Sequence, residues 1–427
     1  MYSDHSVSSM YSDHSVSSMY SDHSVSSMYS DHSVSSMYSD HSMSSMYSDH
    51  AVSSMYEVSC RKVHFHGLVL AGEPCGLELR TGGMANNPQG QRLDPRRKRF
   101  FKRNIKVEGS LQKSGNRFIL KFLEIYEEQI TDELKTVIHG YMSEVLHSIF
   151  FLGNIHREKI MPTDFFEEKE LLKLNNKFSK PFNEFCTHLP TRTPFSILLD
   201  AVVKIKGSQN ETQVMEYLST LLKELSVPKP TNMTYSNYYT LEATVICICH
   251  YERTGGGITK KFYGASLSCK GQRERQVIIS LSCRHTWTLK VAYAVALAGE
   301  GGAIQLPQTV KCKAFKRNRE KDHYCEEPPC TNCINIFKGA TFEPCHIEAD
   351  EDPNWPYGNC AETESLSKLL NADPALCEQV QVLKNNMTAD LDLERNTVWS
   401  NATRKLVDLL TGTDYLRNGN DILFFVP

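Results

Sequence analysis

The sequence contains the stretch Trp355-Pro-Tyr-Gly-Asn-Cys-Ala-Glu-Thr-Glu-Ser-Leu-Ser-Lys-Leu-Leu370, on which the expected fold depends. Pro356 and Gly358 predict a turn, and the leucines at the end of the stretch recur at the three- and four-residue spacing of a helix with one apolar face. Cys360 and Glu362 therefore fall in the first turn of this helix. Free backbone N–H groups and the helix dipole favour a thiolate and a carboxylate there. A thiolate can bind a metal ion, and a carboxylate two residues later can transfer protons beside that ion.

A cysteine-rich segment precedes this helix. Pro329-Cys330-Thr-Asn-Cys333 places two cysteines one helical turn apart, so that both sulfurs can face one metal ion. Further candidate ligands lie close by in the sequence, namely Cys325, Cys345, His346 and Cys360. So many cysteine and histidine residues in a short segment predict a zinc site.

The two motifs together resemble those of the cytidine deaminase superfamily, in the form that has Cys before Ala-Glu and a separate Pro-Cys-x-x-Cys. The resemblance implies that Cys330, Cys333 and Cys360 bind Zn²⁺ and that Glu362 is a proton shuttle that does not bind the metal. It also implies deamination of a cytosine-type base, nucleoside or nucleic acid by zinc-activated water. The order of the motifs differs, because in the family the Cys-Ala-Glu helix comes before Pro-Cys-x-x-Cys, whereas here it follows.

Two alternatives without catalysis remain open. A closed structural zinc site would take four ligands from Cys325, Cys330, Cys333 and either Cys345 or His346, in a cytosolic interaction protein. A deaminase fold with a degraded site could instead serve only in binding. The discriminating observation is whether Cys360 joins Cys330 and Cys333.

The C-terminal part, residues 231–427, is expected to be an α/β domain with a deaminase-like sheet and flanking helices. Thr244–His250 is β-branched and apolar on both faces, which is typical of a central strand. A glycine-rich turn then leads into a second expected strand, Lys261–Cys269. The Cys-Ala-Glu helix should lie on one face of this sheet. Between Arg273 and Ala298 a helix is expected, with a strand as the alternative at its end.

Three segments precede this domain. Residues 1–56 hold tandem copies of Met-Tyr-Ser-Asp-His-Ser-Val-Ser-Ser, which offer too little apolar surface to form a core and predict disorder. Residues 57–117 predict an irregular basic segment. Residues 118–230 predict a mainly helical domain, in which Phe118–Phe151 has helical periodicity and Phe195–Ile205 fits either a strand or a helix.

The formal net charge of -3 does not indicate a polyanionic partner, so only local clusters of basic residues suggest one. Basic runs at 96–103 and 311–321 are candidate contacts for a nucleotide or nucleic acid. The first run could instead be a solvated linker without a binding role. No segment has the length of an apolar membrane span, so no membrane contact is expected. The N-terminus lacks the pattern of a signal peptide, which predicts a cytoplasmic or nuclear protein with reduced cysteines.

Overall fold

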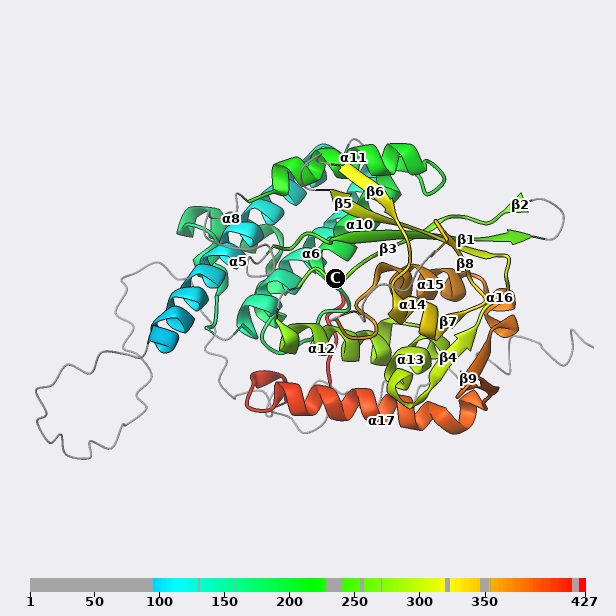
Figure 1. Ribbon diagram of the computed structural model, residues 1–427. Coiled ribbons are helices and arrows are strands. Elements are labelled where there is room, and N and C mark those ends of the chain that lie inside the picture. The colour runs from blue at the N-terminus through cyan, green and yellow to red at the C-terminus, as the bar shows by residue number, and fades with distance from the viewer. Residues whose placement is uncertain are drawn as a thin grey trace, which may run out of the picture. The chain divides into compact units, whose positions relative to one another are not determined.

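Figure 1 shows a computed structural model of the chain. It describes residues 95–427 except 130, 157, 228–239, 254–256, 270, 319–322, 346–352, 354 and 417–421, and for 95–109, 253 and 258 it describes the backbone alone. These residues belong to one compact unit, Gly90–Pro427. The repeats at 1–56 and residues 57–94 of the expected irregular segment lie outside the described residues.

The first part of the described chain is helical. Its helices are α5 (Pro95–Glu127), α6 (Asp132–Asn154), α7 (Pro162–Phe165), α8 (Glu168–Lys177), α9 (Ser179–Glu184), α10 (Pro194–Lys206) and α11 (Glu211–Leu225). The sequence predicts one helix over 118–151, whereas the structure has two. The break occurs because the Thr131 side chain accepts a hydrogen bond from the backbone N–H of Leu134 and so caps a new helix.

Two details of these helices bear on the sequence predictions. Phe195–Ile205 is helical, within α10, where Pro194 occupies the first turn that tolerates proline. Helix α5 begins at Pro95, inside the segment 57–117 for which the sequence predicts irregular structure. The division of the chain at residue 231 stays a prediction.

A mixed sheet follows the helices. It contains β1 (Val245–Arg253), β2 (Gly257–Ile258), β3 (Phe262–Ala265), β5 (Val310–Asn318), β6 (His323–Glu327) and β8 (Thr341–Glu343). The strand order is β2-β1-β5-β6, with β3 also paired to β1 and β8 paired to β5. Strands β1 and β3 are antiparallel, as the sequence predicts, and β8 runs parallel to β5.

A second, smaller sheet has the order β10-β9-β4-β7. Its strands are β4 (Gly302–Gln305), β7 (Phe337–Lys338), β9 (Gln381–Lys384) and β10 (Met387–Thr388). The remaining helices are α12 (Gln272–Leu281), α13 (Leu289–Ala296), α14 (Thr331–Ile336), α15 (Ala361–Ala372), α16 (Pro374–Gln379) and α17 (Leu391–Leu410), with a π-helical turn, Ser282–Thr286, after α12. Residues 273–298 are thus helical with a break near Trp287, and the alternative strand is wrong. Helix α17 runs beside α12 and α13 (Figure 1).

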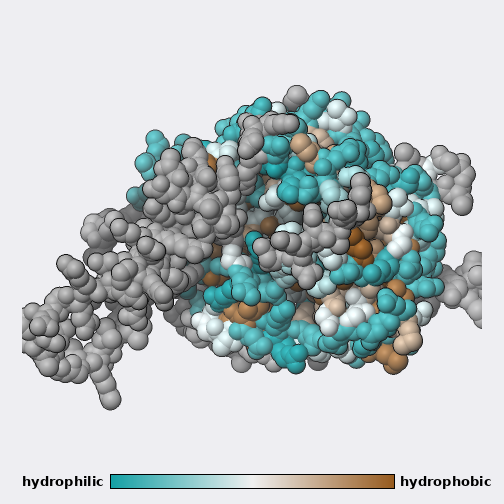
Figure 2. Space-filling view, in the orientation of Figure 1, coloured by the Kyte–Doolittle hydropathy of each residue, from teal (hydrophilic) through white to brown (hydrophobic). Residues whose placement is uncertain are grey.

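Strand β1 separates two apolar cores. Ile246 and Ile248 pack with the N-terminal helices, whereas Cys247 and Cys249 on the opposite face pack with α13, α14 and α15. Successive side chains of a strand point to opposite faces, which accounts for this division. Helix α15 contacts β1 and β3, so the Cys-Ala-Glu helix lies on one face of the sheet as expected. The face of the molecule drawn in Figure 2 is mostly hydrophilic where it is coloured, with apolar residues in separate patches.

Candidate metal centre

Three cysteines from the two predicted motifs meet in space. Cys330 directly precedes α14, Cys333 lies within it, and Cys360 directly precedes α15. The Cys330 sulfur lies 3.7 Å from that of Cys333 and 3.3 Å from that of Cys360. All three sulfurs lie within 4.8 Å of one another. The reversed order of the motifs therefore does not keep them apart. We call Cys330, Cys333 and Cys360 the helix triad.

The chemistry of the helix triad suits a metal ion. Zinc bound to thiolates at about 2.3 Å in a tetrahedron holds its sulfurs about 3.8 Å apart, and the triad needs only small adjustments to reach that separation. The indole Nε1 of Trp355 donates a hydrogen bond to the Cys360 sulfur at 3.2 Å. Such a donor to a ligating sulfur is typical of the groups that surround a metal site.

The thiols of the helix triad influence one another. Hydrogen bonds from Cys333 and Cys360 lower the pKa of Cys330 to about 3. The same contacts raise the pKa of Cys333, and the bond to Cys330 together with burial raises the pKa of Cys360. One thiolate is thus stabilised by two neutral thiols, while three thiolates so close together require a cation.

Glu362 lies on α15 beside the helix triad and is 4% exposed. Burial, with a further contribution from the nearby Cys247 sulfur, raises the pKa of its carboxyl group to about 8. A hydrogen bond with Cys333 opposes part of that rise. The carboxyl group is therefore influenced both by the helix triad and by a cysteine of β1.

A second group of three cysteines was not predicted from the sequence. Cys247, Cys249 and Cys312 are buried, and their sulfurs also lie within 4.8 Å of one another. Strand periodicity places Cys247 and Cys249 on one face of β1, a signal that Cys-x-Cys in a strand provides. The contribution of Cys312 depends on the pairing of β1 with β5, which a single sequence does not reveal. We call these residues the sheet triad.

The alternative structural ligands lie elsewhere. Cys325 is on β6, where its sulfur lies 3.4 Å from the Nε2 atom of His323. Cys345 is exposed. In the part of the chain that the structure describes, neither belongs to a group of three or more possible ligands whose atoms all lie within 4.8 Å of one another. His346 lies outside the described residues.

A polar network fixes α15 against the N-terminal helices. Arg192 forms ion pairs with Glu144 of α6 and Asp200 of α10, and Lys368 of α15 pairs with Asp200 and Glu364. Because each charge has an opposite partner, the network stabilises the position of the helix that carries Cys360 and Glu362.

A cavity of about 300 Å³ adjoins this network and is lined by Glu144, Thr191, Arg192, His285, Thr286, Trp287, Glu364, Ser367 and Lys368. A narrower hollow shares Arg192, Trp287 and Glu364 with it and reaches Cys360. Within the helix triad, Cys360 borders the narrower hollow, which adjoins the cavity through Arg192, Trp287 and Glu364.

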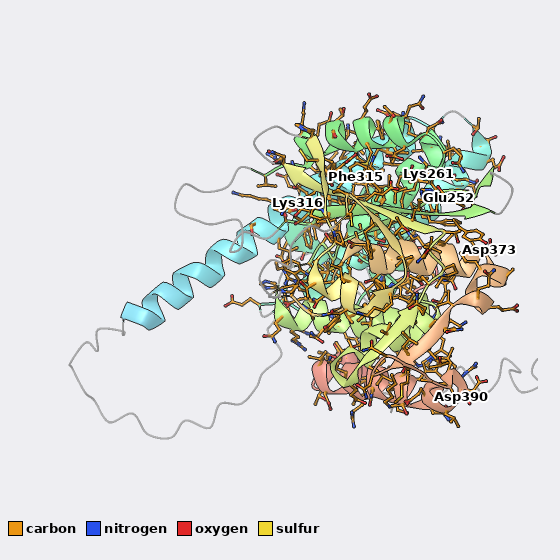
Figure 3. The ribbon with its side chains drawn as sticks, turned by 45° about the vertical axis from the view of Figure 1, so that its right-hand side comes forward. Glu252, Lys261, Phe315, Lys316, Asp373 and Asp390 are labelled. Atoms are coloured by element: carbon orange, nitrogen blue, oxygen red, sulfur yellow. The ribbon has the colours of Figure 1, made fainter. Side chains whose placement is uncertain are left out.

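The two basic runs differ in what the structure describes. The run 96–103 lies in the first turns of α5, where only the backbone is described. In the run 311–321, Lys311 pairs with Glu252, Lys313 with Glu326 and Lys316 with Glu327, and Arg317 forms a buried ion pair with Glu242. Figure 3 places Phe315 and Lys316 at one end of this sheet and Glu252 and Lys261 toward the other. The four described cations of this run thus each have an acidic partner, whereas Arg319 and Lys321 lie outside the described residues. Nucleic-acid binding stays a prediction.

Comparisons with known proteins leave the family open. No family model, curated protein or solved structure matches the chain. Among the described residues, no helix combines the length and apolar character needed to cross a membrane. The location of the protein in the cell stays a prediction.

Proposed function

We propose that the protein is a zinc-dependent, deaminase-like hydrolase that acts on a cytosine-type base, nucleoside or nucleic acid. The observation that carries the proposal is the meeting of Cys330, Cys333 and Cys360, without Cys325 or Cys345. A three-ligand set that leaves one position open is typical of catalytic rather than structural zinc. The participation of Cys360 is what the resemblance to cytidine deaminases requires.

Each residue has a distinct role in this proposal. The three sulfurs hold the metal ion, which when bound supplies an activated water for attack on the ring carbon that carries the amine. Glu362 accepts a proton at its carboxylate oxygens and delivers it to the substrate. Trp355 orients the Cys360 sulfur through its hydrogen bond.

The experiment measures zinc content and turnover in the same purified variants. Cys330→Ser and Cys360→Ser should each lose one zinc per chain relative to the wild type. Glu362→Gln should keep that zinc and its thermal stability, yet lose roughly 100- to 10,000-fold in ammonia release, the usual contribution of a positioned acid–base group. The substrates are cytosine, cytidine, deoxycytidine and a cytosine-containing single-stranded oligonucleotide.

Cys325→Ser is the matched control, because Cys325 is close in sequence but outside the helix triad. It should keep full zinc content and turnover. Full zinc occupancy in Cys360→Ser would contradict the catalytic assignment whatever substrate is tested.

A second candidate, a structural metal site in an interaction protein, is favoured by a different observation. Glu362 and Cys333 are buried, and Glu362 does not line the cavity that adjoins α15. In that case zinc would be lost from Cys360→Ser as before. However, neither the wild type nor any variant would release ammonia from a substrate, and Glu362→Gln would keep its zinc.

A further inference from the structure

The sheet triad stands on two paired strands. Cys247 and Cys249 are alternate residues of β1, and Cys312 of β5 is the direct cross-strand partner of Cys249. The Cys249 sulfur lies 3.1 Å from that of Cys312 and 3.7 Å from that of Cys247. The three sulfurs are held by a backbone ladder that continues on both sides of them, so their convergence does not depend on a loop.

A polar group from a third element completes this arrangement. The hydroxyl group of Ser365, on α15, lies 2.9 Å from the Cys249 sulfur, and Ser365 is 0% exposed. It reaches the sulfur because α15 lies directly on β3 at Gly264, where a Cβ atom would come within 2.4 Å of the helix backbone. The three sulfurs of the sheet triad and the Ser365 hydroxyl group therefore gather at one buried place.

Ordinary core packing explains this composition less well. The opposite face of the same strand carries Ile246 and Ile248, which fill a core without burying any polar side-chain atom. Isolated buried cysteines behave as small apolar residues, but three that converge with a serine place four weakly polar groups where an apolar side chain would fit. Thiolate sulfurs are the ligands that thiophilic cations select.

We propose that Cys247, Cys249 and Cys312 form a second metal site, distinct from the helix triad, which holds a thiophilic cation, either Zn²⁺ or Cu⁺, with the Ser365 hydroxyl group beside it. The sulfurs need to separate by less than about 1 Å to surround zinc at its usual bond length. All the contributing side chains are buried, so the site is closed to substrate and its role is structural. It joins β1, β5 and α15, the elements on which the helix triad and Glu362 depend.

This second site does not rest on the proposed function. The helix triad could bind its metal without the sheet triad, and the reverse is equally possible, since the two share no ligand. Variants of each triad should therefore lose metal independently.

The test measures zinc and copper per chain by elemental analysis of the full-length protein purified without chelator. The wild type should contain close to two thiophilic metal ions per chain, and Cys249→Ala and Cys312→Ala should each contain close to one. The identity of the lost element distinguishes zinc from copper. Cys283→Ala is the matched control, because Cys283 is a buried cysteine of the same core that belongs to neither triad, and it should keep both ions.

Several results would overturn the second site. Unchanged metal content in Cys249→Ala and Cys312→Ala would do so, as would a Cys249–Cys312 disulfide found by mass spectrometry of the wild type. If an alanine variant fails to fold, X-ray absorption of Cys360→Ser tests the second site instead. An ion with sulfur ligands that remains in this variant supports a metal site at the sheet triad, and the absence of any ion refutes it. Metal lost from Cys249→Ala but kept in Cys360→Ser would refute the proposed function while the second site stands.

Discussion

Arg317 and Lys316 are neighbours on β5, yet their charges have different surroundings. The side chains of Arg317 and its partner Glu242 are each 2% exposed, whereas Lys316 is 53% exposed and pairs with the partly exposed Glu327. Both residues belong to a run whose basic character alone suggests a polyanion contact. The strand period instead turns one cation into the protein and the other toward water.

Removing each cation should therefore have unequal effects. Arg317→Met leaves the Glu242 carboxylate buried without its ion pair and should lower the free energy of unfolding by roughly 3–5 kcal/mol. Lys316→Met removes only a solvent-screened pair and should cost about 0–1 kcal/mol. Urea unfolding of both variants measures the difference. Equal costs would show that the Arg317–Glu242 pair contributes no more than a surface pair.

At the scale of single elements, α15 is the helix that contacts both triads. The helix carries Cys360 at its start, then Glu362 and Ser365, and its backbone lies against β3 at Gly264. Only a residue without a Cβ atom permits this approach, because the nearest helix atoms would be 2.4 Å from it. A substitution at Gly264 should therefore displace Cys360 of the helix triad and the Ser365 hydroxyl group beside the sheet triad.

Gly264→Ala should push α15 away from the sheet. Overpacking of this kind typically costs about 1–3 kcal/mol, and the shift should also weaken metal binding because it moves Cys360 relative to α14. Thermal unfolding and the rate of zinc loss to a chelator measure the two effects. Gly299→Ala is the control, since a Cβ atom there has no neighbour within 4 Å, and it should change neither. If Gly264→Ala releases zinc no faster than the control, the position of α15 does not determine how tightly the metal is bound.

The sequence allows prediction of those elements whose signals are local. Strand β1 follows from a β-branched, apolar run, β3 follows from the return of the chain after a glycine-rich turn, and α15 follows from leucine spacing after a turn. The helix triad could be proposed because Cys330, Cys333 and Cys360 stand in recognisable short motifs. The sheet triad could not, because Cys312 joins it only through strand pairing.

The errors have the same origin. The break between α5 and α6 depends on a capping hydrogen bond that the Thr131 side chain accepts from the backbone N–H of Leu134, which apolar periodicity does not report. The apolar pattern of 376–383 by itself favours a helix, but helix α16 ends at Gln379 and strand β9 begins at Gln381. Pairing with β4 stabilises the strand, and that contact is long-range. Local propensity is overridden where a tertiary partner is available.

At the scale of the whole described unit, the end of the chain returns to its helical part. Phe424 forms an isolated parallel β-bridge with Leu189, which precedes α10. The Phe425 ring is 1% exposed and stacks on the ring of His147 of α6, with 4.0 Å between ring centroids. His147 is thus enclosed by the C-terminal segment. Its protonation state is therefore linked to the packing of the C-terminal segment against α6.

Burial lowers the pKa of His147 to about 3, and this shift predicts a dependence of stability on pH. In the unfolded chain a histidine takes up a proton below about pH 6.5, whereas in the folded protein His147 stays neutral down to about pH 3. Because the unfolded state binds more protons in that window, the free energy of unfolding should fall as pH decreases from about 6.5, by at most about 1.4 kcal/mol per pH unit from this group. His147→Phe removes the titration and keeps a ring on Phe425. Urea unfolding at pH 7.5, 6, 5 and 4.5 should show the wild type losing stability relative to the variant below pH 6.5, with a constant difference above it. Parallel curves down to pH 4.5 would mean that His147 becomes protonated without unfolding, so that the C-terminal segment does not keep it from water.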